Sequence, residues 1–133
     1  MSDAVVEQLV SRAFSRAAAA GANAAIDEVR ERLEAETGAP TFSYELFVPR
    51  ANVEAFFVEQ VLPRLVSFLS CRGLRTARTP GVFVSLFTDD GIAFLHAGEV
   101  VELLGQRRGL SVDDCFRRYA DGGTGDPKAL GAG

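Results

Sequence analysis

The chain has 133 residues, close to the commonest size of a single folded domain, and its 47% hydrophobic residues are enough for a substantial core. The formal net charge of −4 argues against binding to polyanions through the charge of the whole protein. No apolar run approaches the roughly 20 residues that span a bilayer. The first residues lack the basic and apolar regions of a secretory signal, so we expect an intracellular protein of the cytoplasm or nucleus, not a secreted or membrane protein.

The first part of the chain is predicted to be helical. Apolar residues at helical spacing predict one helix over residues 3–20 and a second over about 24–36, with Gly21 between them. The first helix is rich in alanine and apolar over a wide stripe. The core of a chain of this length is too small to cover this stripe as well. We therefore expect residues 1–36 to form a helical arm whose first helix packs on a second copy of the chain or on another protein.

The middle of the chain predicts one strand and one long helix. Apolar and polar residues alternate over residues 41–48, which is typical of a half-buried strand. Residues 51–71 are apolar on two faces, which is typical of a helix at the centre of its fold, so Phe57 and Leu65 are expected in the core. Pro63 lacks a backbone N–H group and should kink this helix.

The C-terminal part predicts a β-hairpin followed by two short helices. The turn sequence Asp89-Asp90-Gly91 separates two runs of β-forming residues. Ser111 stands three residues before Asp114, which is the spacing of a helix capping box. The expected elements are strands at residues 82–87 and 92–95 and helices at about 97–104 and 112–120.

Together these elements predict a single α+β domain over residues 1–120. Its core, residues 41–120, is expected to hold a small antiparallel sheet of about three strands packed on the central helix, with two short C-terminal helices. Residues 1–36 form the helical arm. Residues 121–133 contain five glycines and little apolar content, so we expect a disordered tail.

No pattern of residues indicates a catalytic centre, a metal site or a cofactor. Nucleophilic catalysis needs a base beside the nucleophile, and His96 is the only histidine. Cys71 and Cys115 stand at helical spacing among apolar neighbours, which is typical of reduced core thiols. With His96 they supply too few ligands for a metal. We therefore expect a protein that is not an enzyme.

Arginines are the candidate functional residues. Residues 64–118 carry eight arginines against six acids. Because affinity for nucleic acid rests on neutralised phosphates, the candidates are those in the turn between the last two helices, on the last helix and in the connector after the central helix. They are Arg107, Arg108, Arg117, Arg118, Arg72, Arg75 and Arg78. Two short helices with a basic turn are compatible with a helix-turn-helix-like element, and the alternative is a solvated basic face.

Several short motifs within residues 82–123 stand in the order found in one protein family. They are Val82-Phe83-Val84-Ser85-Leu86-Phe87, Asp89-Asp90-Gly91, Ala93-Phe94, Glu99-Val100-Val101-Glu102-Leu103-Leu104-Gly105 and Asp114-Cys115-Phe116-Arg117-Arg118-Tyr119-Ala120-Asp121. In this order they resemble the N-terminal domain of the baculovirus repeated ORF proteins, the Bro-N domain of DNA viruses and phages. The family has an aromatic residue where this chain has Ala93. The resemblance implies a viral domain that binds DNA or modulates transcription.

Two functions remain open at this point. The first is a non-enzymatic nucleic-acid-binding or transcription-modulating domain, with DNA as the partner. The alternative is a protein-interaction or assembly module that acts as a homo-oligomer or adaptor through the N-terminal helix. No cofactor is expected in either case.

Overall fold

The computed structural model describes residues 4–18, 20–48, 53–71 and 81–120. The strands are β1 (Ser15–Ala17), β2 (Phe42–Phe47), β3 (Val82–Thr88) and β4 (Gly91–His96). The helices are α1 (Ala4–Ser11), α2 (Ala22–Thr37), α3 (Val53–Phe56), α4 (Leu62–Cys71), α5 (Ala97–Arg107) and α6 (Val112–Tyr119), with a π-helical turn, η1 (Phe57–Val61), between α3 and α4. The predicted α+β class is confirmed.

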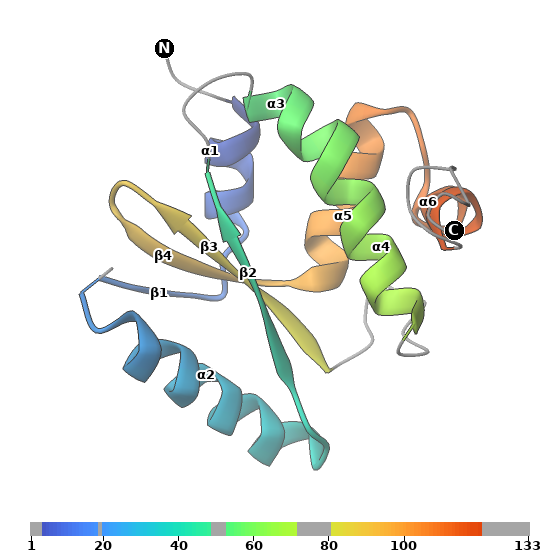
Figure 1. Ribbon diagram of the computed structural model, residues 1–133. Coiled ribbons are helices and arrows are strands. Elements are labelled where there is room, and N and C mark those ends of the chain that lie inside the picture. The colour runs from blue at the N-terminus through green and yellow to red at the C-terminus, as the bar shows by residue number, and fades with distance from the viewer. Residues whose placement is uncertain (1–3, 19, 49–52, 72–80, 121–133) are drawn as a thin grey trace.

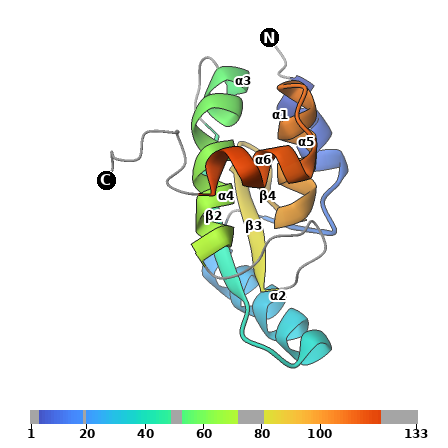
Figure 2. The same cartoon turned by 90° about the vertical axis from the view of Figure 1, so that its right-hand side faces the viewer.

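The elements form three layers, and the middle layer is one four-stranded sheet. Helix α2 covers one face of the sheet, and α1, the continuous helix α3–η1–α4 and α5 cover the other (Figure 1). Helix α6 packs against α4 and α5 on the outside of this second layer (Figure 2). In the described part of the chain, no helix combines the length and apolarity needed to cross a bilayer.

The sheet has the strand order β1-β4-β3-β2. Strand β4 pairs antiparallel with both β1 and β3, whereas β2 pairs parallel with β3, with Phe42 opposite Val82 and Phe47 opposite Phe87. The expectation of an antiparallel sheet of about three strands is therefore corrected. The long helix forms a crossover that returns the chain to the end of the sheet where β2 began, so β3 must run parallel to β2.

The helix predicted over residues 3–20 is wrong beyond Ser11, where α1 ends. The Phe14 N–H group donates to the Phe94 carbonyl at 2.8 Å, and residues 15–17 then pair with β4 as β1. The helix propensity of the alanines is small, so hydrogen bonding and apolar packing along β4 decide the conformation.

Residues 1–36 do not form an arm in the part that the structure describes. Val5 and Leu9 of α1 are fully buried in the core of their own chain. On the other face of the sheet, Ile26 and Val29 of α2 pack with the β-strand residues around Phe94. The apolar stripe that was expected to need a partner is thus covered in part within the chain, because Val6 and Val10 are only partly buried against this core.

The central helix has the position and the irregularity that the sequence predicted. Phe57 and Leu65 are fully buried, as expected. In η1 the hydrogen bonds shift register, so that the Leu62 N–H group donates to the Phe57 carbonyl. Pro63 follows directly, and its ring has no N–H group and would clash with the carbonyl four residues earlier in a regular helix.

The hairpin and the last two helices lie close to their predicted positions. Gly91 follows the hairpin turn with φ +140°, and a Cβ atom there would lie 2.4 Å from the Ala17 carbonyl oxygen, so only glycine lets β1 approach this closely. The capping box of α6 is present: the Asp114 N–H group donates to Ser111 Oγ at 3.1 Å, and the Ser111 N–H group donates to Asp114 Oδ2 at 3.3 Å. Helix α5 runs to Arg107, three residues further than predicted. The predicted tail, residues 121–133, lies outside the described residues.

Candidate functional site

The turn between α5 and α6 brings two basic segments close to each other. Gly109 has φ +71°, and the Leu110 N–H group donates to the Gly105 carbonyl at 2.8 Å, so α5 ends in a tight turn. A Cβ atom on Gly105 would lie 2.8 Å from Cys115 Sγ. This close packing fixes the end of α5, where Arg107 and Arg108 lie, against α6, which carries Arg117 and Arg118.

Two of the predicted nucleic-acid-binding arginines already have partners in the protein. Arg107 turns toward α1 and α3, where Nη1 lies 3.5 Å from Glu54 Oε2 and Nη2 lies 3.2 Å from Gln8 Oε1. Arg117 forms an ion pair with Asp114 one turn earlier in α6. Exposed ion pairs are weak, but each would have to be broken or shared before the arginine could bind a phosphate.

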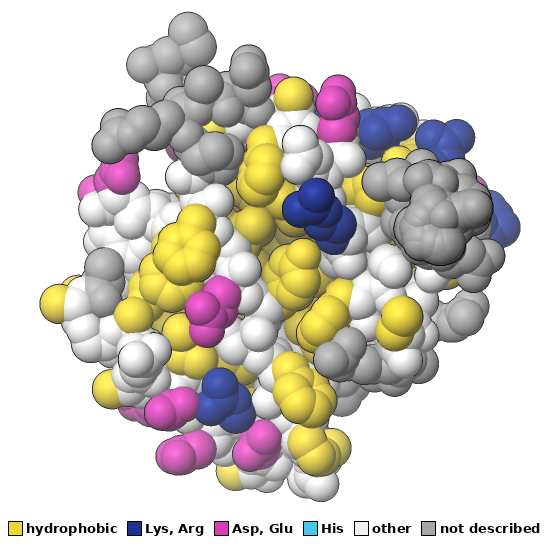
Figure 3. Space-filling view, viewed as in Figure 1, with side chains coloured by type: hydrophobic (Ala, Val, Ile, Leu, Met, Phe, Trp, Pro, Cys, Tyr) yellow, Lys and Arg dark blue, Asp and Glu magenta, His cyan; other side chains and the backbone are white. Residues whose placement is uncertain are grey.

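Arg108 and Arg118 are exposed, and no ion pair joins either of them to another described residue. Burial raises the pKa of the Cys115 thiol, the Asp114 carboxylate raises it further, and the charges of Arg108 and Arg118 act in the opposite direction. Both guanidinium groups therefore lie within electrostatic reach of the same thiol. Figure 3 shows basic side chains gathered on this side of the molecule, around α6.

Helix α6 carries two acidic residues as well as two arginines. Asp113 and Asp114 stand in its first turn and offset part of the charge of Arg117 and Arg118. The other predicted residues, Arg72, Arg75 and Arg78, lie outside the described residues.

A second candidate site is the outer edge of β2, which is the last strand of the sheet. The Phe42 N–H group donates to the Gly81 carbonyl at 2.8 Å, and the Val48 N–H group donates to the Phe87 carbonyl at 3.2 Å. Even-numbered residues of β2 thus direct their backbone groups to β3, and the odd-numbered residues direct theirs outward. In the described part of the chain, no backbone hydrogen bond joins these outward groups to another segment. The outward-directed residues are Ser43, Glu45 and Phe47.

The edge of β2 also carries the two large hydrophobic side chains that are exposed among the described residues. Phe47 is 63% exposed and Phe42 is 48% exposed. The Phe47 ring stacks on Phe87 with centroids 4.5 Å apart, so its outer face remains open to solvent. Figure 3 looks onto this edge and shows a band of hydrophobic side chains through the middle of the surface. An exposed hydrophobic edge strand is a ready template for another strand.

The two sides of β2 have different charged residues near them. On the α4 side, Tyr44 packs against Phe68 with ring centroids 5.3 Å apart; burial raises the pKa of Tyr44, and the charge of Arg64 opposes that rise. Because side chains alternate along a strand, Glu45 and Phe47 project on the α2 side. Arg64 belongs to α4, which covers the other face of the sheet from the one on which Glu45 projects.

The sequence contains a signal for this edge. In the alternating run 41–48, one set of positions holds Thr41, Ser43 and Glu45 and then Phe47. A large aromatic residue on an otherwise polar side of a strand predicts an exposed apolar contact, but the alternation alone does not assign that contact a function.

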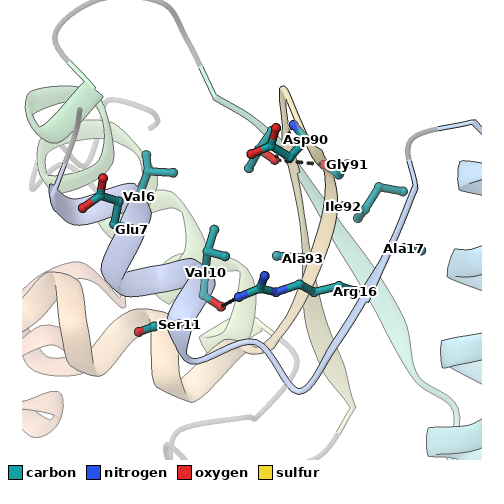
Figure 4. Close-up of a pocket in the computed structure, with 11 residues that line it drawn as sticks. Val6, Glu7, Val10, Ser11, Arg16, Ala17, Asp90, Gly91, Ile92 and Ala93 are labelled. Atoms are coloured by element: carbon teal, nitrogen blue, oxygen red, sulfur yellow. Dashed lines mark hydrogen bonds between the residues drawn. The ribbon is translucent and has the colours of Figure 1, made fainter. Parts of the chain in front are cut away.

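A groove of about 370 Å³ lies between α1, β1 and the β3–β4 hairpin (Figure 4). Val6 and Val10 form its helical wall, and Glu7 and Asp90 stand on opposite walls. The Arg16 guanidinium donates to the Val10 carbonyl at 3.1 Å, where it ties β1 to α1. The residues that line the groove include neither histidine nor cysteine.

His96, Cys71 and Cys115 are not among the residues that line this groove. His96 stacks on Phe14 with ring centroids 4.5 Å apart, and its side chain does not cap α5. Cys115 is buried as expected, whereas Cys71 is exposed at the end of α4, so the expectation of a core thiol is wrong for Cys71. Among the described residues, no group of three or more His, Cys, Asp or Glu side chains is placed to hold a metal ion.

No family model, curated protein or solved structure matches this chain. The resemblance of residues 82–123 to the Bro-N domain therefore remains a prediction. The choice between the two candidate surfaces rests on their geometry and chemistry.

Proposed function

We propose that the protein is a non-enzymatic protein-interaction module that binds an extended segment of another chain along the outer edge of β2. The observation that carries the proposal is Phe47, 63% exposed on an edge strand whose outward backbone groups have no partner among the described residues. An added strand would pair with these N–H and C=O groups, and covering Phe47 would remove apolar surface from water.

The charge distribution supports this proposal over nucleic-acid binding. The chain has a net charge of −4, and Arg107 and Arg117 are engaged with carboxylates of the protein. Nucleic-acid affinity depends on several free basic groups that converge on phosphates. Strand addition needs only backbone groups and apolar contacts, and β2 presents both.

The proposal is tested by selecting random displayed peptides on the immobilised full chain. We expect the selected peptides to lose affinity about tenfold or more on Phe47→Ser, because burying a Phe side chain contributes about 1.5–3 kcal/mol. Glu45→Pro should have a similar effect, because it removes an outward N–H group and leaves the bonds to β3 in place.

Glu7→Ala on α1 is the control, because Glu7 is exposed and lies outside β2. Circular dichroism of each variant checks that the fold is retained. Selected peptides that bind the Phe47 and Glu45 variants as tightly as the parent chain would refute the proposal.

Nucleic-acid binding is the second candidate function, supported by Arg108 and Arg118, which are exposed in the α5–α6 turn and on helix α6, respectively, and by the Bro-N resemblance. If the domain binds DNA, replacing both arginines by alanine should weaken binding and flatten its salt dependence by about one to two units of log–log slope. Arg30→Ala on α2 is the control. A mobility-shift titration over a range of salt concentrations measures both quantities. Failure of the unmutated protein to shift duplex or single-stranded DNA at low salt would exclude this function.

A further inference from the structure

We propose that the strand added to β2 comes from a different protein and carries a basic side chain opposite Glu45, two residues from an aromatic or aliphatic side chain opposite Phe47. This inference rests on the proposed function and specifies the chemistry of the partner. It follows from the charge of Glu45, from the row of rings that ends at Phe47, and from the consequences of pairing β2 with itself.

Glu45 is the one charged residue of β2, and it is exposed at the middle of the strand. In the described part of the chain it forms no ion pair, and Arg64 lies on the α4 side of the strand rather than on its side. Directly opposed side chains on neighbouring strands lie close together, and opposite charges at such positions attract. A lysine or arginine of the added strand would therefore be favoured at this position.

Phe47 sets the second requirement, because it shares the α2 side of β2 with Glu45. The rings of Phe87 and Phe47 are nearly parallel, with an interplanar angle of 13°, and so form the start of a row of stacked rings across the sheet. A side chain on the added strand opposite Phe47 would continue this row over its exposed face. Since side chains on one side of a strand recur every second residue, this position lies two residues from the basic one.

A second copy of the chain fits the edge poorly. Two β2 strands related by a twofold axis would pair antiparallel, and directly opposed residues must lie on the same side of the sheet. The two registers with the longest overlap centre on Glu45 or on Tyr44. The first places the two Glu45 carboxylates directly opposite each other, and the second places them diagonally on the same side. Like charges in these positions oppose pairing, and a charge on an edge strand is a known protection against self-association.

The experiment measures binding of the full chain to two labelled eight-residue peptides of alternating valine and threonine. Both peptides contain one phenylalanine. Two residues away from it, the first peptide has lysine and the second has glutamate. We expect the lysine peptide to bind the wild type about 2–5-fold more tightly than the glutamate peptide does, as opposed cross-strand charges predict. Glu45→Lys should reverse this preference, and Glu45→Gln should reduce it toward equality.

Amide hydrogen exchange distinguishes the failure of this inference from the failure of the proposed function. If both peptides slow exchange at Ser43, Glu45 and Phe47 but bind equally to every variant, β2 accepts strands without the charge preference, and only the inference is wrong. If neither peptide slows exchange at these amides, both are wrong. Light scattering on the free protein tests self-pairing: a dimer that Phe47→Ser dissociates would show that a second copy is the occupant and overturn the inference.

Discussion

Replacing Phe57 by alanine is expected to lower the free energy of unfolding by about 3–5 kcal/mol. Phe57 is fully buried at the start of η1, within the core that this helix forms with the sheet, α1 and α5. Truncation removes the transfer free energy of the ring and leaves a cavity that the surrounding helices cannot close completely. Urea unfolding measures the effect as a lower midpoint at unchanged slope.

The neighbouring Phe56 supplies the matched control, because it is half-buried and its loss should cost less than the loss of Phe57. Leu65→Ala, at a second fully buried position of the same helix, should cost about 2–5 kcal/mol. Near-neutral midpoints for both Phe57→Ala and Leu65→Ala would show that this helix is not the centre of the core.

Replacing Gly91 by alanine is expected to cost about 2–4 kcal/mol, because backbone strain and a steric clash act together at this residue. Its φ of +140° disfavours any side chain, and the new Cβ atom would lie 2.4 Å from the Ala17 carbonyl oxygen. Since that contact is with backbone, β1 must move away from β4 to relieve it. We expect faster amide exchange in residues 15–17 together with a lower urea midpoint.

Gly109→Ala separates the two contributions to the effect at Gly91. Gly109 also has a positive φ, +71°, but nothing lies within 4 Å of the position that a Cβ atom would take. Its replacement should therefore show backbone strain alone, about 1–2 kcal/mol. Equal losses for the two variants would mean that the clash with the Ala17 carbonyl oxygen adds nothing to the cost of Gly91→Ala.

Elements with a strong local pattern could be predicted from the sequence. The alternation in residues 41–48 predicted β2, the two apolar faces of residues 51–71 predicted the central helix, and the capping box at Ser111 predicted the start of α6. In each case the signal lies within a few consecutive residues and agrees with the environment that the tertiary structure provides. Phe57 and Leu65 could be placed in the core for the same reason.

The location of the candidate site depended on contacts between distant segments. Ser15–Ala17 forms a strand because it hydrogen-bonds to β4, and this contact cannot be read from the alanine-rich segment alone. Arg107 and Arg117 looked equivalent in sequence, yet one contacts Glu54 and Gln8 from other helices and the other contacts Asp114. Local spacing shows which residues share a face of an element, but not which element will cover that face.

By itself, the sequence determined the α+β class, the central helix, the hairpin and the two C-terminal helices, because hydrophobic periodicity and turn chemistry act over short distances. Only the tertiary structure decided that β2 pairs parallel with β3 and forms the edge of the sheet. The same alternating residues would suit a central strand or an edge strand. Whether Phe47 is buried or exposed therefore depends on the strand order, and strand order is a property of the whole chain.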